Sequence, residues 1–314
     1  MGRIKSKMKI FVTGAAGQLG RDVTAELENR GHNVVRSDIV QDEDNRYGGS
    51  YISLDITDEM AVEECLNKIR PEAVIHCAAW TAVDAAEEES NREKVYAINV
   101  KGTENIARAC KKISAKMIYI STDYVFDGQG ERPWEPEDKQ YAPLNYYGKT
   151  KLAGEHAVVQ TLEKFFIVRI AWVFGKNGKN FVKTMLELGK KYEKLRIVCD
   201  QIGTPTYTYD LAKLLADMIE TEKYGYYHAT NEGEYISWYA YAKEIFAEAV
   251  RRGQLQYEEN RLVVEPVTTE EYGQSKALRP FNSRLSKQKL TENGFSPLPT
   301  WQDALKRYFD ELDY

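Results

Sequence analysis

The N-terminal half of the chain alternates short apolar runs with longer segments in which apolar positions follow a helical spacing. The apolar runs that predict buried strands are residues 9–13, 33–38, 51–54, 73–76, 117–120 and 165–170. The segments with helical spacing are 21–30, 55–69, 90–112 and 143–159. Strands that alternate with helices in this way predict an α/β fold with a doubly wound parallel sheet of the Rossmann type.

After residue 170 the alternation becomes irregular. Helical spacing returns from about residue 180, over 210–219 and from 300, and residues 226–229 read as a further strand. We expect a dinucleotide-binding Rossmann domain formed by residues 8–170 and about 203–235. A smaller, mostly α-helical substrate domain would comprise residues 171–202 and 236–314, and residues 1–7 would be an N-terminal tail.

Composition excludes several classes of protein. With 43% apolar and 29% charged residues, the 314-residue chain has the composition of a folded globular protein. No basic run indicates nucleic-acid binding, and no apolar run approaches the roughly 18 residues that span a bilayer. The four cysteines lie far apart without Cys-x-x-Cys spacing, which indicates reduced thiols and no structural metal. We therefore expect a cytoplasmic protein without a nucleic-acid or membrane partner.

A glycine motif, Gly14-Ala-Ala-Gly17-Gln-Leu-Gly20, follows the first strand directly and opens the first helix. In dinucleotide-binding folds, the first glycine permits a tight turn and the second lets the backbone approach a pyrophosphate. The third lets the helix pack closely on the strand, and the helix N-terminus faces the phosphates. The motif predicts a dinucleotide cofactor. The alternative is a turn of small residues that only tightens the packing.

The second strand ends at Asp38, about 20 residues after the glycines. An acid at this place can bond the adenosine ribose hydroxyls and would repel a 2′-phosphate, which favours NADH. Arg36 lies two residues earlier and can soften this preference, so NADPH stays open. In the alternative interpretation, Asp38 only caps a loop or helix.

Tyr147 and Lys151 lie four residues apart in the helical segment 143–159, so they share one helix face. An ammonium beside a phenol favours the phenolate and lowers its pKa from about 10. A phenol tuned in this way can deliver a proton to a carbonyl oxygen. Ser121 and Thr122 follow the strand 117–120 and should reach the same sheet edge. The alternative is an ordinary solvated helix face.

These motifs resemble those of the extended short-chain dehydrogenase/reductases, and within them the dTDP-4-dehydrorhamnose reductase family. The resemblance implies reduction of the 4-keto group of dTDP-4-dehydro-L-rhamnose by NADH or NADPH in dTDP-rhamnose biosynthesis, by an enzyme expected to form a homodimer. It runs from Met8 through essentially the whole chain and is carried by residues 14–20, 55–58, 78–84, 121–128, 147–155, 180–185, 203–206 and 279–283.

The resemblance also implies roles for individual residues. The catalytic set is Thr122, Tyr147 and Lys151, and the positions on the sugar-nucleotide side are Thr122, Asp123, Tyr124 and Trp172. For Trp172 the alternative is an aromatic residue of the core. Tyr147 and Lys151 also match cofactor positions, together with Gly14, Gly17, Gln18, Leu19, Asp38, Asp55, Ile56, Ala79, Trp80 and Thr81. Relatives often carry His or Tyr in place of Trp80.

The sequence discriminates within the superfamily. Sugar-nucleotide 4,6-dehydratases carry Asp and then Glu after the threonine, whereas Asp123 is followed by Tyr124, which favours simple reduction. Two other functions stay open: reduction of another nucleotide-linked 4-keto-6-deoxysugar, and a non-catalytic role similar to that of a regulatory subunit of methionine adenosyltransferase. Some relatives bind Mg²⁺ at a dimer contact through an acid after the glycine loop, where this chain has Asp22, and the metal is left open.

Overall fold

The computed structural model describes residues 7–41, 48–255 and 262–312. In these residues a seven-stranded parallel sheet has the order β11–β6–β5–β4–β1–β2–β3. The strand order reverses between β1 and β4, so the expected doubly wound fold is confirmed. Most of the expected tail, residues 1–6, lies outside the described residues. The strands are β1 (Lys9–Thr13), β2 (Asn33–Asp38), β3 (Ser50–Ser53), β4 (Ala73–His76), β5 (Lys116–Thr122), β6 (Phe165–Ile170) and β11 (Gly225–His228).

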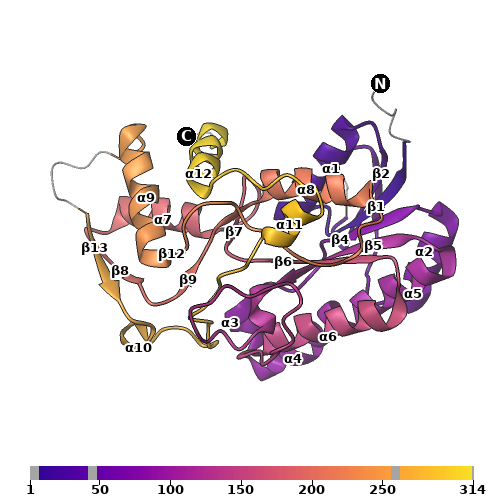
Figure 1. Cartoon of the computed structure of the whole chain (residues 1–314), viewed down its shortest axis with the longest axis horizontal. Helices are drawn as coiled ribbons and strands as arrows, with labels where there is room; N and C mark the ends of the chain where they lie inside the picture. The colour runs from indigo at the N-terminus through magenta and orange to yellow at the C-terminus, as the bar shows by residue number, and fades with distance from the viewer. Residues whose placement is uncertain (1–6, 42–47, 256–261, 313–314) are drawn as a thin grey trace.

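Helices cover both faces of the sheet (Figure 1). On one face α1 (Gln18–Asn29) packs along α8 (Thr208–Ile219). On the other face α2 (Glu59–Ile69), α5 (Thr103–Ile113) and α6 (Tyr146–Thr161) lie side by side. Each layer has its own apolar core, the first around Val12 and Val23 and the second around Val74 and Leu66. The sheet edge at the carboxyl ends of the strands is thereby left for a ligand.

The helix that carries Tyr147 and Lys151 begins at Tyr146 and not at Pro143, because the Asn145 side chain caps it by accepting a bond from the Gly148 amide at 2.8 Å. Within this helix, Gly154 lies so close to β5 that a Cβ atom there would collide with the Tyr119 hydroxyl. The missing side chain lets α6 approach the sheet closely.

The expected single helix over residues 90–112 is wrong. The structure has α4 (Glu89–Tyr96), a π-helical segment (Ala97–Gly102) and then α5. The wide turn orients the Asn99 side chain inward, where it bonds the Trp80 backbone and the Thr150 hydroxyl. Insertions of this kind are frequent at functional sites.

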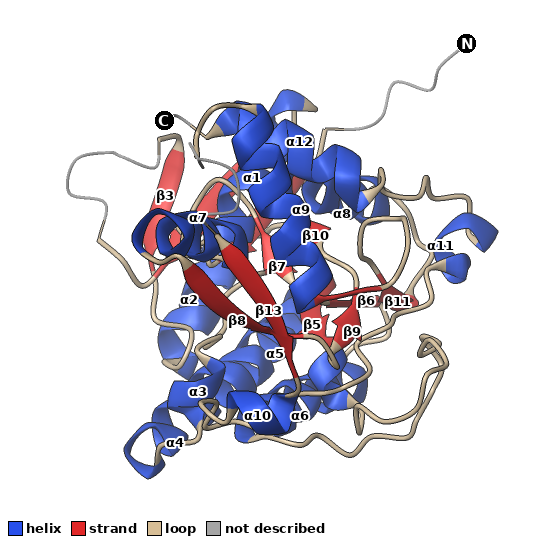
Figure 2. Cartoon of the chain, turned by 90° about the vertical axis from the view of Figure 1, so that its left-hand side faces the viewer, coloured by secondary structure: helices blue, strands red, loops and turns tan. Residues whose placement is uncertain are grey.

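A second lobe follows the sheet and faces the viewer in Figure 2. Its core lies around Phe174, Tyr241 and Tyr308, and β8 pairs in parallel with β13. Within residues 203–235, α8 and β11 pack with the first lobe, and the domain division stays a prediction. The elements outside the first lobe's sheet and helix layers are α3 (Val83–Ala86), β7 (Val173–Phe174), α7 (Phe181–Lys191), β8 (Lys194–Val198), β9 (Ile202–Gly203), β10 (Thr206–Tyr207), β12 (Ile236–Ser237), α9 (Trp238–Arg251), β13 (Val263–Val267), α10 (Thr269–Tyr272), α11 (Gln288–Glu292) and α12 (Trp301–Glu311).

None of the described helices combines the length and the apolar character needed to cross a membrane.

Candidate active site

The glycine motif forms the turn between β1 and α1. Gly14 has φ +65°, and a Cβ atom there would lie 2.6 Å from the Ala78 amide nitrogen. A Cβ atom at Gly20 would collide with the Gly14 carbonyl oxygen, so this glycine is needed for packing. No side chain caps α1 at Gly17, which is exposed. The helix N-terminus can therefore receive an anionic group from a ligand.

A cavity of about 220 Å³ opens at the carboxyl ends of β1, β2 and β4. The buried Ser37 hydroxyl lines it and has no hydrogen-bond partner within the described part of the chain, so it can serve a ligand. The predicted cofactor residues that line the cavity are Gly14, Gly17, Asp38, Asp55, Ile56 and Ala79. Sequence reasoning missed Thr13, Ser37, Ile39, Leu54, Cys77, Ala78 and Ile98, most of which could have been found as ends of the predicted strands.

Besides Tyr147 and Lys151, four predicted cofactor residues lie outside the wall of this cavity. Leu19 packs in the core under α1, and the Gln18 amide oxygen accepts a bond from Asn180 at 3.3 Å. The backbone of Trp80 is held by the Asn99 side chain, and Thr81 is exposed. The structure therefore does not bring these four side chains together with the other six.

The Asp38 carboxylate accepts two backbone bonds, from Ala16 at 3.0 Å and from Ile39 at 2.8 Å. It thus caps the glycine loop, as the alternative interpretation holds, and it also lines the cavity. Arg36 is buried and pairs with Glu28 on α1 at 2.5 Å. The guanidinium is engaged there, so it does not neutralise Asp38.

Thr122 and Tyr147 meet where β5 ends and α6 begins. Desolvation and the charge of Asp123 raise the pKa of the Tyr147 phenol, and the neighbouring Thr122 side chain lowers it only in part. The pKa of the phenol is therefore raised above its ordinary value, and the side chain is partly exposed. A phenol that stays protonated at neutral pH is a proton donor.

Lys151 is 3% exposed, and its Nζ donates a bond of 2.8 Å to the Ile120 carbonyl. It also lies 4.1 Å from the centre of the Tyr119 ring. Burial lowers the pKa of Lys151 to about 7. The ammonium thus faces β5, and Lys151 is not among the groups that shift the pKa of Tyr147 here, so its expected effect on the phenol stays a prediction.

The residues expected on the sugar side surround Thr122. Asp123 is 2% exposed, accepts the Thr122 hydroxyl bond at 3.0 Å, and has a pKa raised to about 6 by burial. The Tyr124 ring meets the Tyr147 ring edge-on at 5.7 Å. Trp172 stacks on Trp238 at 3.7 Å and has φ +51°, a strained value for a bulky residue. Such strain at the junction of the two lobes is typical of a functional position.

A cleft of about 770 Å³ is lined by both lobes, and its wall includes Trp238, the ring on which Trp172 stacks. Three cations line it, Lys194 and Arg196 from β8 and Arg279 from the segment before α11, along with aromatic rings such as Trp238. Arg279 forms a bidentate ion pair with Asp84 from the first lobe. Cations and aromatic rings in one cleft suit a nucleoside diphosphate. No periodic pattern along the chain indicates this set of residues, although Arg279 lies in a segment that carried the family resemblance.

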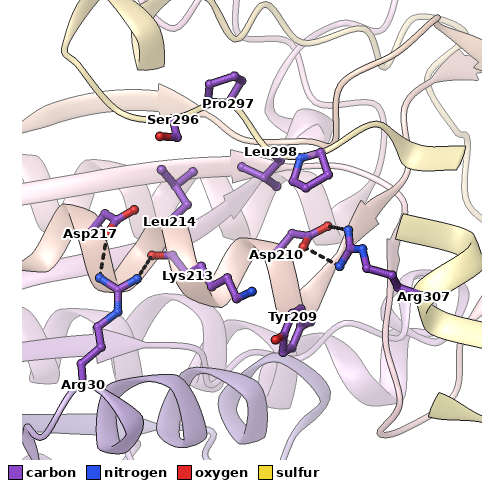
Figure 3. Close-up of a pocket in the computed structure, with 11 residues that line it drawn as sticks. Arg30, Tyr209, Asp210, Lys213, Leu214, Asp217, Ser296, Pro297, Leu298 and Arg307 are labelled. Atoms are coloured by element: carbon purple, nitrogen blue, oxygen red, sulfur yellow. Dashed lines mark hydrogen bonds and ion pairs between the residues drawn. The ribbon is translucent and has the colours of Figure 1, made fainter. Parts of the chain in front are cut away.

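A separate cavity of about 460 Å³ lies between α1, α8 and the segment before α12 (Figure 3). Its walls hold two ion pairs, Arg30 with Asp217 at 2.6 Å and Arg307 with Asp210 at 2.7 Å. None of its lining residues was predicted as a site residue. Its charges are paired with one another, so this cavity has the character of a structural contact.

Asp22, the residue at which a metal was left open, lies near this face. Burial raises the pKa of its carboxyl, and the nearby Thr208 side chain lowers it in part. Over the described ranges, no group of three or more His, Cys, Asp and Glu side chains is arranged to hold a metal ion.

The chain was then compared with known proteins. The model of the RmlD substrate binding domain family matches residues 8–314. The dTDP-4-dehydrorhamnose reductase of Escherichia coli K12 is 38% identical over 310 residues, 97% of this chain and 98% of that protein. The spore coat polysaccharide biosynthesis protein SpsK of Bacillus subtilis is 37% identical over 96% of this chain and 97% of that protein.

Solved structures agree with the sequence comparison. The crystal structure of dTDP-4-dehydrorhamnose reductase from Bacillus anthracis in complex with NADP is 40% identical, with a TM-score of 0.86 over 98% of this chain and 100% of that one. The reductase of Clostridium acetobutylicum is also 40% identical, with a TM-score of 0.85 over 96% and 99%. The resemblance inferred from the motifs is confirmed, and the chain belongs to the RmlD family, that of the dTDP-4-dehydrorhamnose reductases.

Proposed function

We propose that this protein reduces the 4-keto group of dTDP-4-dehydro-L-rhamnose to a hydroxyl, giving dTDP-L-rhamnose, with NADH or NADPH as the reductant. The observation that carries the proposal is the meeting of Thr122, Tyr147 and Lys151 at the same sheet edge as the glycine-loop cavity. Family membership supports the same activity.

The residues of the cavity fit a nicotinamide dinucleotide. The uncapped N-terminus of α1 at Gly17 suits the pyrophosphate, and the orphaned Ser37 hydroxyl and the Asp38 carboxylate offer bonds to sugar hydroxyls. When bound, the cofactor supplies the hydride for the sugar carbon. A reductase of 40% identity binds NADP. For this chain we propose a preference for NADH, supported by the position of Asp38.

The protein's own groups supply the proton. The Tyr147 hydroxyl would donate it to the carbonyl oxygen at C4, while the Thr122 hydroxyl bonds the same oxygen and holds it in place. The resulting phenolate would be stabilised by the positive charge of Lys151, for which the family also implies a bond to the nicotinamide ribose. The Tyr147 phenol is protonated at neutral pH, so the proton is present before the reaction.

The nucleotide part of the substrate is assigned to the cleft beside the catalytic residues. Lys194, Arg196 and Arg279 would bind the diphosphate, and the Trp172–Trp238 stack offers a flat apolar wall for the sugar. Asp123 and Tyr124 would face the sugar hydroxyls. A homodimer, a cytoplasmic location and a bound Mg²⁺ ion stay untested.

Oxidation of NADH and of NADPH should be followed with dTDP-4-dehydro-L-rhamnose, for the wild type and for Tyr147→Phe. The wild type should oxidise the coenzyme, and the variant should lose at least about 100-fold in kcat because the proton donor is gone. A matched control is Tyr146→Phe, the neighbouring phenol on α6, which should retain activity. Absence of oxidation by the wild type would refute the substrate, and full activity of Tyr147→Phe would refute the mechanism.

A further inference from the structure

Glu155 and Arg169 form an ion pair in the interior of the first lobe. Both side chains are 0% exposed, with Arg169 Nη2 2.7 Å from Glu155 Oε2 and Nε 2.8 Å from Oε1. Burying two charges costs several kcal/mol of desolvation, which their attraction does not always offset. Fold stability alone is therefore a weak reason for this pair, and its neighbours indicate what else it does.

The pair connects the elements that carry the catalytic groups. The Ser121 hydroxyl donates a bond of 2.5 Å to Glu155 Oε1, and Ser121 directly precedes Thr122 on β5. Glu155 lies one helical turn after Lys151, so both are on the same face of α6. One carboxylate therefore contacts the strand end that presents Thr122 and lies beside the helix turn that presents Lys151.

Arg169 extends the network to the loop of residues 128–143. Its Nη1 donates to the Pro136 carbonyl at 3.2 Å and its Nη2 to the Tyr141 hydroxyl at 2.9 Å. The loop is thus fastened to the same ion pair as the catalytic strand and helix.

The groups that face the Lys151 ammonium come from three elements. Glu155 faces it from α6, the Tyr119 ring from β5, and His76 and Cys77 from the end of β4. Burial keeps the thiol and the imidazole uncharged, since it raises the pKa of Cys77 to about 12 and lowers that of His76 to about 3. Among these groups Glu155 is the anion.

We propose that Glu155 is a positioning residue of the reductase: it fixes the Ser121–Thr122 end of β5 against α6 and supplies the anionic partner of the Lys151 ammonium. This inference rests on the proposed function for its catalytic meaning, but the electrostatic part concerns the protein alone. Because Lys151 is buried, loss of the anion would favour the neutral amine and remove the charge that stabilises the phenolate.

The first test measures Lys151 directly, without coenzyme or sugar. The lysine side-chain carbon signals are titrated by NMR in wild type and Glu155→Gln, with Lys151→Arg used to identify the signal of Lys151. The pKa of Lys151 should fall by roughly one in Glu155→Gln. Glu163→Gln, which removes an exposed carboxylate just beyond α6, should leave the pKa of Lys151 unchanged. An unchanged pKa in Glu155→Gln would overturn the electrostatic role.

The Glu155→Gln variant leaves Arg169 buried and unpaired. The double variant Glu155→Gln/Arg169→Met is therefore measured as well, because it buries no unpaired charge. A smaller fall in the pKa of Lys151 is expected in it, because the positive charge of Arg169 is removed as well. Ser121→Ala keeps the ion pair and removes only the bond to β5. It should lower kcat about tenfold, with little change in the KM of the coenzyme or the pKa of Lys151.

Kinetics separate this inference from the proposed function. If the wild type oxidises no coenzyme, the reductase proposal fails, whereas the NMR result still decides the charge pairing. If the wild type is active, the fall of kcat/KM at alkaline pH should begin at lower pH in Glu155→Gln than in wild type. If the pH profiles coincide, or if kcat is unchanged in Ser121→Ala, Glu155 has no positioning role and contributes only to the packing of the core.

Discussion

Asp84 and Arg279 are 195 residues apart in sequence, yet they form a bidentate ion pair at the rim of the nucleotide cleft. Arg279 Nη2 lies 2.6 Å from Asp84 Oδ2, and Nη1 lies 3.2 Å from Oδ1. The pair joins the segment before α11, in the second lobe, to α3 in the first. It also holds the guanidinium at the place where we assign the substrate diphosphate.

Arg279→Met should therefore weaken binding of dTDP by about 10- to 100-fold, because a charge-assisted bond to an anion contributes roughly 1.5–3 kcal/mol. Isothermal titration calorimetry at low and moderate salt measures this directly. Lys276→Met is the matched control, since Lys276 pairs with Glu88 and does not line the cleft. Equal affinity of Arg279→Met and wild type would show that the diphosphate binds elsewhere.

Two glycines of the same motif should respond differently to alanine. Gly17 has φ −75° and is exposed, so Gly17→Ala should fold normally, with a Tm within about 2 °C of wild type, but bind NADH at least about tenfold more weakly. In Gly20→Ala the methyl group would collide with the Gly14 carbonyl, so we expect a loss of roughly 1–3 kcal/mol in stability. Thermal unfolding and fluorescence titration with NADH, performed on both variants, separate the effects. The reverse order would contradict the assigned roles.

His76 should make the protein less stable in acid. It is buried and bonded to the hydroxyls of Thr13 and Thr103, and burial lowers its pKa from 6.5 to about 3. Between these values the unfolded chain binds a proton that the folded protein does not. The stability from His76 is therefore complete above pH 6.5 and lost progressively as the pH falls toward 3. Between pH 7 and pH 5 the loss is about 2 kcal/mol.

Urea unfolding at pH 7 and pH 5 measures this loss. His76→Gln should be less stable at both values, but its decrease between them should be about 2 kcal/mol smaller than in wild type. His156→Gln, at an exposed histidine, should keep the wild-type decrease. If His76→Gln and wild type lose the same stability, the imidazole is not the group that titrates.

Local sequence patterns predicted those features of the fold and the site that depend only on residues close together in the chain. The strand termini Thr13, Asp38 and Thr122 and the glycine turn were predicted from short stretches of sequence. The parallel sheet brings them to one edge. Each of these features is encoded within a few residues of its own position.

The features that sequence reasoning missed depend on distant partners. The direction of Lys151 is set by the Ile120 carbonyl and the Tyr119 ring on another element, which helical spacing does not contain. The π-helical turn at Asn99 follows from its bonds to Trp80 and Thr150. A side chain that is tied by tertiary contacts overrides the local preference for a regular helix.

Coenzyme preference provides the last prediction. The Asp38 carboxylate is fixed by two backbone amides at the rim of the cofactor cavity, and Arg36 is held by Glu28. A 2′-phosphate on the adenosine ribose would meet an uncompensated negative charge there. We therefore expect wild type to have a higher kcat/KM for NADH than for NADPH. Asp38→Ala should shift the ratio toward NADPH by about tenfold, equivalent to roughly 1.4 kcal/mol.

Asp55→Ala is the control for this change, because Asp55 also lines the cavity but its carboxylate accepts bonds from the backbone and hydroxyl of Thr57. If any negative charge in the cavity were enough to disfavour NADPH, both Asp38→Ala and Asp55→Ala would shift the ratio of kcat/KM values toward NADPH. We expect only Asp38→Ala to do so, since the ribose-binding acid ends the second strand. A wild type that strongly prefers NADPH, as the NADP-bound relative allows, would instead mean that Asp38 serves only to cap the glycine loop.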